Sequence, residues 1–149
     1  TVNATPGILS NLIEVDIICT ATPSKKELFN LSNLKKGVHI NAIGSYKANM
    51  QELDPLILKA ARVFVDQKMS CLAESGDFIK PINAGLFTAE QIHGEIGEFT
   101  LNSIAGRTTE KEITIFKSVG VAIQDFVVAN AIYEKSLQKS FGQTIKFFE

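Results

Sequence analysis

The sequence predicts an α/β fold built on a parallel sheet, with flanking helices and a long helix near its C-terminus. Short, continuous apolar runs are typical of strands that are covered on both faces. Helix-start signals lie between these runs, and the connections are short. A longer stretch with helical apolar spacing follows the last run. A strand, a helix and another strand in this order are typical of a right-handed βαβ unit.

Three strands are expected in the first half of the chain. The first of them stops at Thr22-Pro23-Ser24, because this sequence breaks an apolar run with turn-forming residues. Before the third strand, Asp54 is suited to an N-cap and Pro55 to the first helical position, which predicts a short helix through Ala61. The expected strands are residues 15–21, 38–43 and 62–66.

Two helices are expected in the next part of the sequence. Residues 69–75 are expected to form a short helix that ends at Gly76. Thr88 and Gln91 have the spacing of a capping box, and apolar residues through Ile104 follow at helical spacing. These patterns predict a second helix over residues 92–104, although two glycines in it weaken the helix or allow close packing.

The C-terminal part predicts a final strand and the longest helix. Residues 112–117 alternate between polar and apolar side chains, as strands do. Ser118 is then expected to cap the helix and to place its N-terminus at the end of this strand, where an anion or polar ligand would bind. Residues 142–149 are too few to classify. The apolar positions of the helix are Val119, Ala122, Ile123, Phe126, Val127, Ala131 and Leu137.

Length and composition predict one ordinary globular domain over residues 1–149. A hydrophobic share of 45% with 21% charged residues argues against disorder. A net charge of −1 with scattered basic residues offers no footprint for nucleic acid or an anionic membrane. Cys19 and Cys71 lack metal-ligand spacing, so we expect no metal site and interpret them as reduced thiols in a cytoplasmic protein.

The segment Gly37–Tyr46 carries the strongest functional signal that comes from residues alone. An apolar strand runs directly into a turn that contains Gly44. An open α/β sheet binds its ligands at the carboxyl ends of its strands. Thr22 and Ser118 also follow strands, so a ligand site is expected where these three strands end. No glycine-rich G-x-G-x-x-G turn precedes this segment in the sequence.

Six segments, taken in order, resemble the ornithine cyclodeaminase and mu-crystallin family. The resemblance covers nearly the whole chain except roughly the last dozen residues. Each segment alone is weak evidence, whereas the ordered set is specific. The segments are Asp16–Ser24, Gly37–Gly44, Gln51–Asp54, Ala61–Asp66, Gly94–Glu98 and Glu112–Gly120.

The resemblance implies a Rossmann domain that binds NAD or NADP, in a family that interconverts imines or oxo acids with amino acids. It implies that the chain is the second half of this cofactor domain plus C-terminal helices. The glycine-rich loop, the acid that reads the ribose, the substrate domain and the catalytic lysine would lie outside it. The chain alone is therefore expected to be inactive and to bind cofactor weakly.

Some site residues can be inferred from the resemblance, position by position. Thr22 corresponds to a residue that borders the dinucleotide. Ile43, Gly44, Ser45 and Tyr46 correspond to the turn beside the nicotinamide. Ser118 corresponds to a cofactor contact, and Val119 to its neighbour that faces the substrate.

One position departs from the cyclodeaminases of this family. They carry an acid/base aspartate where this chain has Tyr46. A phenol donates a proton but is a poor base at neutral pH. The resemblance therefore favours an NAD(P)-dependent reductase of a small imine or oxo acid, such as a ketimine, pyrroline-2-carboxylate or the substrate of an alanine dehydrogenase. A cyclodeaminase and a non-enzymatic, crystallin-like NAD(P)H-binding protein remain as alternatives.

Several polar residues also have a structural interpretation. His39 is expected to be a hydrogen-bonded core histidine, and His93 a residue on a helix surface. Gly44 is expected to serve a turn with positive φ. Glu95 and Glu98 are expected on one solvated helix face rather than in a catalytic carboxylate pair. Because half of a Rossmann sheet leaves an inner strand unpaired, a homo-oligomer or completion by another chain is expected.

Overall fold

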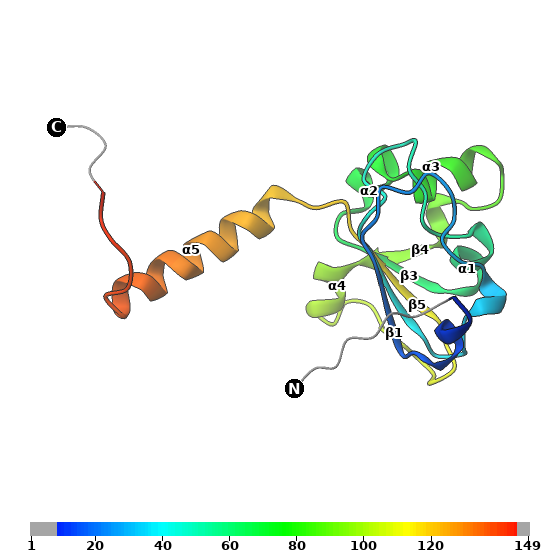
Figure 1. Cartoon of the computed structure of the whole chain (residues 1–149), viewed down its shortest axis with the longest axis horizontal. Coiled ribbons are helices and arrows are strands. Elements are labelled where there is room, and N and C mark those ends of the chain that lie inside the picture. Colours follow the sequence, from blue (N-terminus) through cyan, green and yellow to red (C-terminus); the bar gives the residue numbers. More distant parts are fainter. Residues whose placement is uncertain (1–8, 146–149) are drawn as a thin grey trace. The chain divides into compact units, whose positions relative to one another are not determined.

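The computed structural model describes residues 9–145, whose contacts divide the chain into two compact units (Figure 1). The first unit ends at Val119 and contains the sheet. The second begins at Gly120 and contains the last helix. All the site residues inferred from the sequence, from Thr22 to Val119, therefore belong to the first unit.

The sheet of the first unit has five strands, all parallel, which confirms the predicted fold class. Their order is β1-β2-β5-β3-β4, so β5, the last strand in the sequence, lies in the middle (Figure 1). β1 and β4 form the two edges. The strands are β1 (Ile17–Thr20), β2 (His39–Ala42), β3 (Arg62–Val65), β4 (Ile92–Glu95) and β5 (Thr114–Lys117).

Three short α-helices lie between β2 and β4 in the first unit. Helix α1 (Pro55–Ala60) begins as predicted, with proline at its first position and the side chain of Asp54 as its cap. The helix expected at residues 69–75 is α2 (Lys68–Glu74). The sequence predicts that Gly76 ends the helical region. In the structure α2 ends at Glu74, and Gly76 begins a further helix, α3 (Gly76–Asn83). Two 3₁₀ segments come before β2 in the sequence, Leu9–Glu14 before β1 and Leu31–Asn33 between β1 and β2.

One face of the sheet carries the hydrophobic core. Ile40, Val63 and Ile115, from the three central strands, are fully buried on this face. Side chains of α1, α2 and α3 join the same cluster, including Ile57 and Phe78. The strands are not all covered on both faces, as their continuous apolar sequences predicted, because buried residues alternate with exposed or half-buried ones along β1 and β2.

The helix predicted over residues 92–104 is wrong. Thr88 and Gln91 do form a capping box, but it opens only the 3₁₀ turn Ala89–Gln91. The chain then continues as β4 and, after it, as helix α4 (Ile96–Thr100). Hydrogen bonding to β3 overrides a helical pattern that two glycines weaken.

This change of structure also affects three residues that were expected on the helix, His93, Glu95 and Glu98. His93 lies on strand β4 and not on a helix surface, and its Nδ1 accepts a hydrogen bond from the amide of Val63 at 3.2 Å. Glu95 is the N-cap of α4, and Glu98 Oε2 accepts its backbone N–H at 2.8 Å. The two glutamates therefore form a capping box instead of one helix face.

The second unit contains α5 (Ala122–Gln138), the longest helix of the described residues. Its N-cap is Val121, so the expectation that Ser118 caps it is wrong. Because the helix starts three residues later than expected, its N-terminus does not lie at Ser118 and does not offer the expected ligand site there. In the part from residue 9 to 145, no helix is both long and apolar enough to cross a membrane. Residues 146–149 of the unclassified tail lie outside the described residues.

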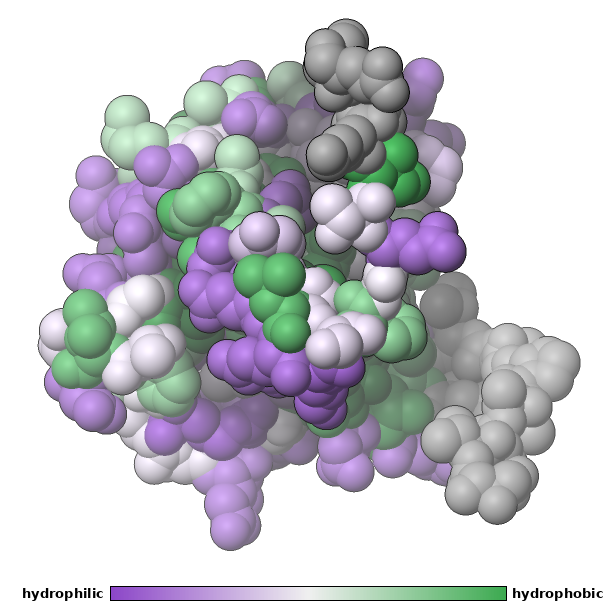
Figure 2. Space-filling view, turned by 90° about the vertical axis from the view of Figure 1, so that its left-hand side faces the viewer, coloured by the Kyte–Doolittle hydropathy of each residue, from purple (hydrophilic) through white to green (hydrophobic). Residues whose placement is uncertain are grey.

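The surface mixes hydrophobic and hydrophilic residues on the face that Figure 2 shows. Many of the exposed hydrophobic side chains come from α5, which has none of its residues buried within the described chain. Ile123, Phe126 and Leu137 are each more than half exposed.

Candidate functional site

Three turns meet at the carboxyl edge of the sheet. Thr20, Ala42 and Lys117 are the last residues of the adjacent strands β1, β2 and β5, and they are in register with one another. The residues that follow are Thr22, Ile43–Tyr46 and Ser118–Val119. The structure thus brings the seven site residues inferred from the sequence to one edge, where open α/β sheets bind ligands.

A buried glutamate joins the first two of these turns. Glu52 is 0% exposed. Its Oε1 accepts hydrogen bonds from the amide and the hydroxyl of Thr22, at 2.6 and 2.8 Å. Its Oε2 accepts from the amide of Gly44 at 2.9 Å and the hydroxyl of Thr20 at 2.8 Å. The carboxylate therefore uses both of its oxygens to hold the backbone of two turns.

Gly44 has a different role from the one expected. It does not adopt positive φ, so left-handed backbone freedom does not explain it. A Cβ at this position would collide with Oε1 of Glu52 and with the backbone N and O of Thr22. Gly44 is needed because the two turns approach each other closely.

Asp77, near the start of α3, supports the same region. Its Oδ1 accepts the amides of Glu52 and Leu53, at 2.7 and 2.9 Å. Its own amide donates to the hydroxyl oxygen of Ser45 at 3.2 Å. Ser45 is fully buried, so its hydroxyl serves the packing of the turn against α3.

Lys117, the last residue of β5, forms a buried ion pair below these turns. Its Nζ lies 3.6 Å from Oδ2 of Asp77 and donates a hydrogen bond to the carbonyl of Ala42 at 3.1 Å. Both charged side chains are 0% exposed. Burial lowers the pKa of Lys117 and raises the pKa of Asp77, while the opposite charge of each partner counteracts the shift.

Asp66, at the end of β3, organises the third turn. Its Oδ2 accepts from the hydroxyl of Ser118 at 2.7 Å and the amide of Val119 at 3.0 Å. Its Oδ1 accepts from the amide of Gln67 and from the thiol of Cys71. The hydroxyl of Ser118 thus holds the turn by donating to Asp66.

The side chains that remain available at this edge are apolar or aromatic. Ile43 and Tyr46 are each 47% exposed, and Val119 is half-buried. Lys47 Nζ lies 5.3 Å from the centroid of the Tyr46 ring. Such surfaces suit a flat ring, and a nicotinamide fits this chemistry. The amides of Thr22 and Gly44 already donate to Glu52, so neither is available to bind a phosphate.

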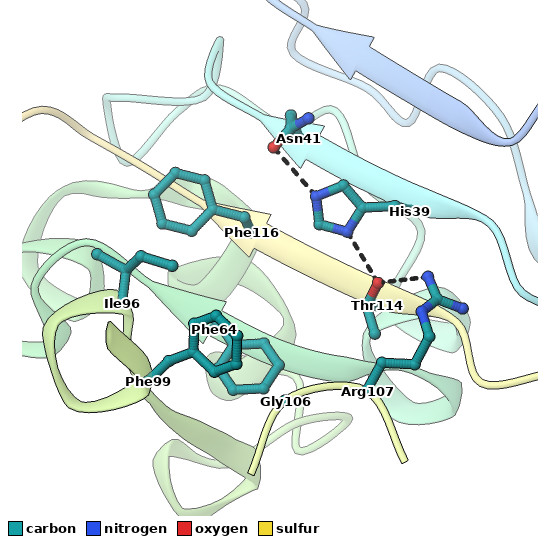
Figure 3. A pocket seen from close by; sticks show the side chains of 9 residues that line it. All are labelled: His39, Asn41, Phe64, Ile96, Phe99, Gly106, Arg107, Thr114 and Phe116. Atoms are coloured by element: carbon teal, nitrogen blue, oxygen red, sulfur yellow. Dashed lines mark hydrogen bonds between the residues drawn. The ribbon is translucent and has the colours of Figure 1, made fainter. Parts of the chain in front are cut away.

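A separate cavity of about 390 Å³ lies on the face of the sheet opposite the core (Figure 3). His39 Nδ1 is 2.8 Å from the hydroxyl of Thr114, and its Nε2 is 3.2 Å from Oδ1 of Asn41. Arg107 also donates to the hydroxyl of Thr114. Both ring nitrogens of His39 are bonded, which agrees with the expected structural role, although the residue is half-buried and lies outside the core.

The two thiols are predicted to differ in reactivity. In the folded 149-residue chain, a thiol reagent should label the exposed Cys19 and leave Cys71 unmodified. Burial and the hydrogen bond to Asp66 raise the pKa of Cys71 to about 12, so its thiolate is scarce. Mass spectrometry should find one label before unfolding and two afterwards. A Cys19→Ser variant should take up no label while folded, and labelling of native Cys71 would contradict its burial.

Sequence reasoning located the turns but not the residues that fix them. Glu52 and Asp77 were not singled out, and Lys117 was seen only as the end of a strand. The available signal was that Lys117 lies two residues after Ile115, on the same face of the expected strand. Among the described residues, no group of three or more His, Cys, Asp or Glu side chains is arranged to hold a metal ion.

Comparisons with known proteins agree on one family. The model of the ornithine cyclodeaminase/mu-crystallin family matches residues 2–140. The chain is 45% identical over 135 residues to a Delta(1)-pyrroline-2-carboxylate reductase of Bacillus cereus, covering 90% of this chain and 41% of the relative. The chain thus spans less than half the length of this relative.

Two solved structures are similar in both sequence and fold. One is the Delta(1)-pyrroline-2-carboxylate reductase of Thermococcus litoralis in complex with NADH and L-proline, with a TM-score of 0.88 and 33% identity. The match covers 95% of this chain and 44% of that one. The other is an archaeal alanine dehydrogenase dimer with bound NAD, with a TM-score of 0.80 and 41% identity, covering 89% and 41%.

Proposed function

Because the chain belongs to the ornithine cyclodeaminase/mu-crystallin family, we propose that it is the nicotinamide-side part of a longer NAD(P)-dependent reductase. Its substrate would be a small imine or oxo acid, with pyrroline-2-carboxylate as the first candidate. The observation that supports this most is 45% identity to a pyrroline-2-carboxylate reductase over 90% of the chain. The turn Gly44-Ser45-Tyr46, which has no carboxylate, points in the same direction.

In this proposal, the carboxyl edge of the sheet holds the nicotinamide end of the cofactor. When bound, the cofactor supplies a hydride to the substrate. Ile43 and Tyr46 would contact the ring, Thr22 and Gly44 would border the dinucleotide through their backbone, and Val119 would face the substrate. Ser45 and Ser118 would act indirectly, because their hydroxyls hold the turns. Donors for the phosphates would come from other parts of the longer protein.

We also propose the wider setting of this protein. A cytoplasmic location is consistent with two free cysteines. A homo-oligomer is supported by the dimeric state of the similar alanine dehydrogenase structure. Strand β1 hydrogen-bonds to β2 on one side only, so its other edge is open to a further strand, which the rest of the longer protein would supply.

The activity is tested on the full-length protein that contains this chain. With NADH or NADPH, pyrroline-2-carboxylate should cause oxidation of the cofactor, followed by absorbance, with formation of proline. Pyruvate with ammonia tests the alanine dehydrogenase reaction, and ornithine tests cyclodeamination. Ammonia release from ornithine would contradict the argument from Tyr46. Cofactor binding without turnover of any substrate would favour the crystallin-like alternative.

A further inference from the structure

The carboxylate of Glu52 is completely committed to the two turns at the carboxyl edge of the sheet. Its four hydrogen bonds reach two hydroxyls and two backbone amides, and each oxygen accepts two of them. The amides of Thr22 and Gly44 belong to different turns, after β1 and after β2. A single buried side chain therefore connects two segments that are more than twenty residues apart in the sequence.

We propose that Glu52 is a positioning residue, which holds the turn after β1 against the turn after β2 and so sets the shape of the cofactor site. This inference rests on the proposed function only for its consequence, the binding of NAD(P)H. Glu52 is fully buried and so does not itself contact the cofactor. It acts through Thr22 and Gly44, whose backbone would border the dinucleotide.

The chemistry of the contact explains why a carboxylate is required. All four groups around Glu52 are donors, and only an ionised carboxylate has two oxygens that both accept. A glutamine would turn an N–H₂ group towards one pair of donors and would lose the bond to the backbone amide of that pair, which can only donate. An aspartate would keep the charge but is one methylene shorter, so it would not reach both turns.

The backbone of Glu52 is held as firmly as its side chain. Asp77 accepts the amides of Glu52 and Leu53, and Lys117 pairs with Asp77. Gly44 allows the turns to come close enough, because any larger residue would collide with Glu52 and Thr22. The position of the carboxylate is thus fixed from the core side, and the two turns adjust to it.

Hydrogen exchange tests the contact itself in the full-length protein. In Glu52→Gln, the backbone amides in peptides that contain Thr22 and Gly44 should exchange at least about tenfold faster than in the wild type. This increase should be larger than any increase in peptides from β5. An equal change in all peptides would show a purely structural role and would overturn the proposal. Glu74→Gln, which changes an exposed glutamate of α2, is the control and should exchange like the wild type.

Titration with NADH tests the consequence. Glu52→Gln should weaken binding by about tenfold, since mispositioned turns lose contacts that the proposal assigns to the cofactor. Faster exchange with unchanged NADH affinity would overturn the positioning role and leave the proposed function intact. Failure of the wild-type protein to bind NADH would instead refute the proposed function, while the exchange data still decide whether Glu52 holds the turns.

A milder variant covers the case in which Glu52→Gln does not fold. Thr20→Val removes one of the four donors and keeps the shape and β-preference of the side chain. We expect a smaller increase in exchange at Gly44, which shares Oε2 with Thr20, than at the same position in Glu52→Gln. Unchanged exchange at Gly44 in this variant, with normal stability, would contradict the proposal.

Discussion

Replacing Lys117 by methionine is expected to lower the free energy of unfolding by about 3–5 kcal/mol, because it leaves a buried carboxylate unpaired. Asp77 and Glu52 are both 0% exposed and lie close to Lys117, which is the cation paired with Asp77. Without that charge, two carboxylates would share one buried region. The measurement is urea unfolding of the wild type and the variant, followed by circular dichroism.

A second variant distinguishes loss of the charge pair from loss of packing. Lys117→Met combined with Asp77→Asn removes both charges and keeps an oxygen that can accept the amides of Glu52 and Leu53. Replacing both members of a buried pair is often close to neutral, so the double variant should be more stable than Lys117→Met alone. Equal stability of the two would show that packing, rather than charge, dominates. Lys36→Met, at an exposed position, should change stability by less than about 0.5 kcal/mol.

The ion pair between Lys117 and Asp77 also connects the polar turns at the carboxyl edge of the sheet to the hydrophobic core. Lys117 belongs to the same face of β5 as Ile115, and Asp77 belongs to the helix that contributes Phe78 to the core. Their contact joins the central strand to α3 directly below the turns after β1 and β2. The site is therefore supported by the same residues that attach the helix to the sheet.

Local sequence signals predicted the elements whose formation depends on neighbouring residues. Asp54 and Pro55 mark the start of α1, and the structure shows the expected cap. Apolar runs predicted three of the five strands, and the alternating pattern of residues 112–117 predicted a fourth. In contrast, β4 has the sequence Ile-His-Gly-Glu, which has no strand pattern of its own and becomes a strand because β3 is beside it.

The turns at the carboxyl edge of the sheet could also be predicted from neighbouring residues, whereas the buried side chains that hold these turns could not. A strand that ends in a turn is visible in the sequence, and Gly37–Tyr46 shows it clearly. Glu52 resembles an ordinary surface acid in the sequence. Its partners are up to 32 residues away, so only the folded chain reveals that four donors surround it. The sequence favours Ser118 as a helix cap, because no residue near it indicates that its hydroxyl donates to Asp66, which is 52 residues away.

Replacing Gly44 by alanine is expected to destabilise the chain by about 1–3 kcal/mol, the usual cost of forcing extra volume into a packed region. The new Cβ would meet Oε1 of Glu52 and the backbone of Thr22. A glutamate side chain can move, but the backbone of Thr22 is held by β1. The two turns would have to separate, so the hydrogen bond from Gly44 to Glu52 should also weaken.

Gly97→Ala provides the matched control for this substitution, because it adds the same methyl group where no atom lies within 4 Å. Gly97 is inside α4, where alanine is favoured over glycine, so this variant should be as stable as the wild type or slightly more stable. Urea unfolding of both variants and the wild type measures these differences in the free energy of unfolding. A combined Glu52→Ala and Gly44→Ala variant should not regain the stability of Glu52→Ala, since Thr22 still occupies the space. If it does regain that stability, Glu52 alone limits the position, and the close approach of the two turns does not require glycine.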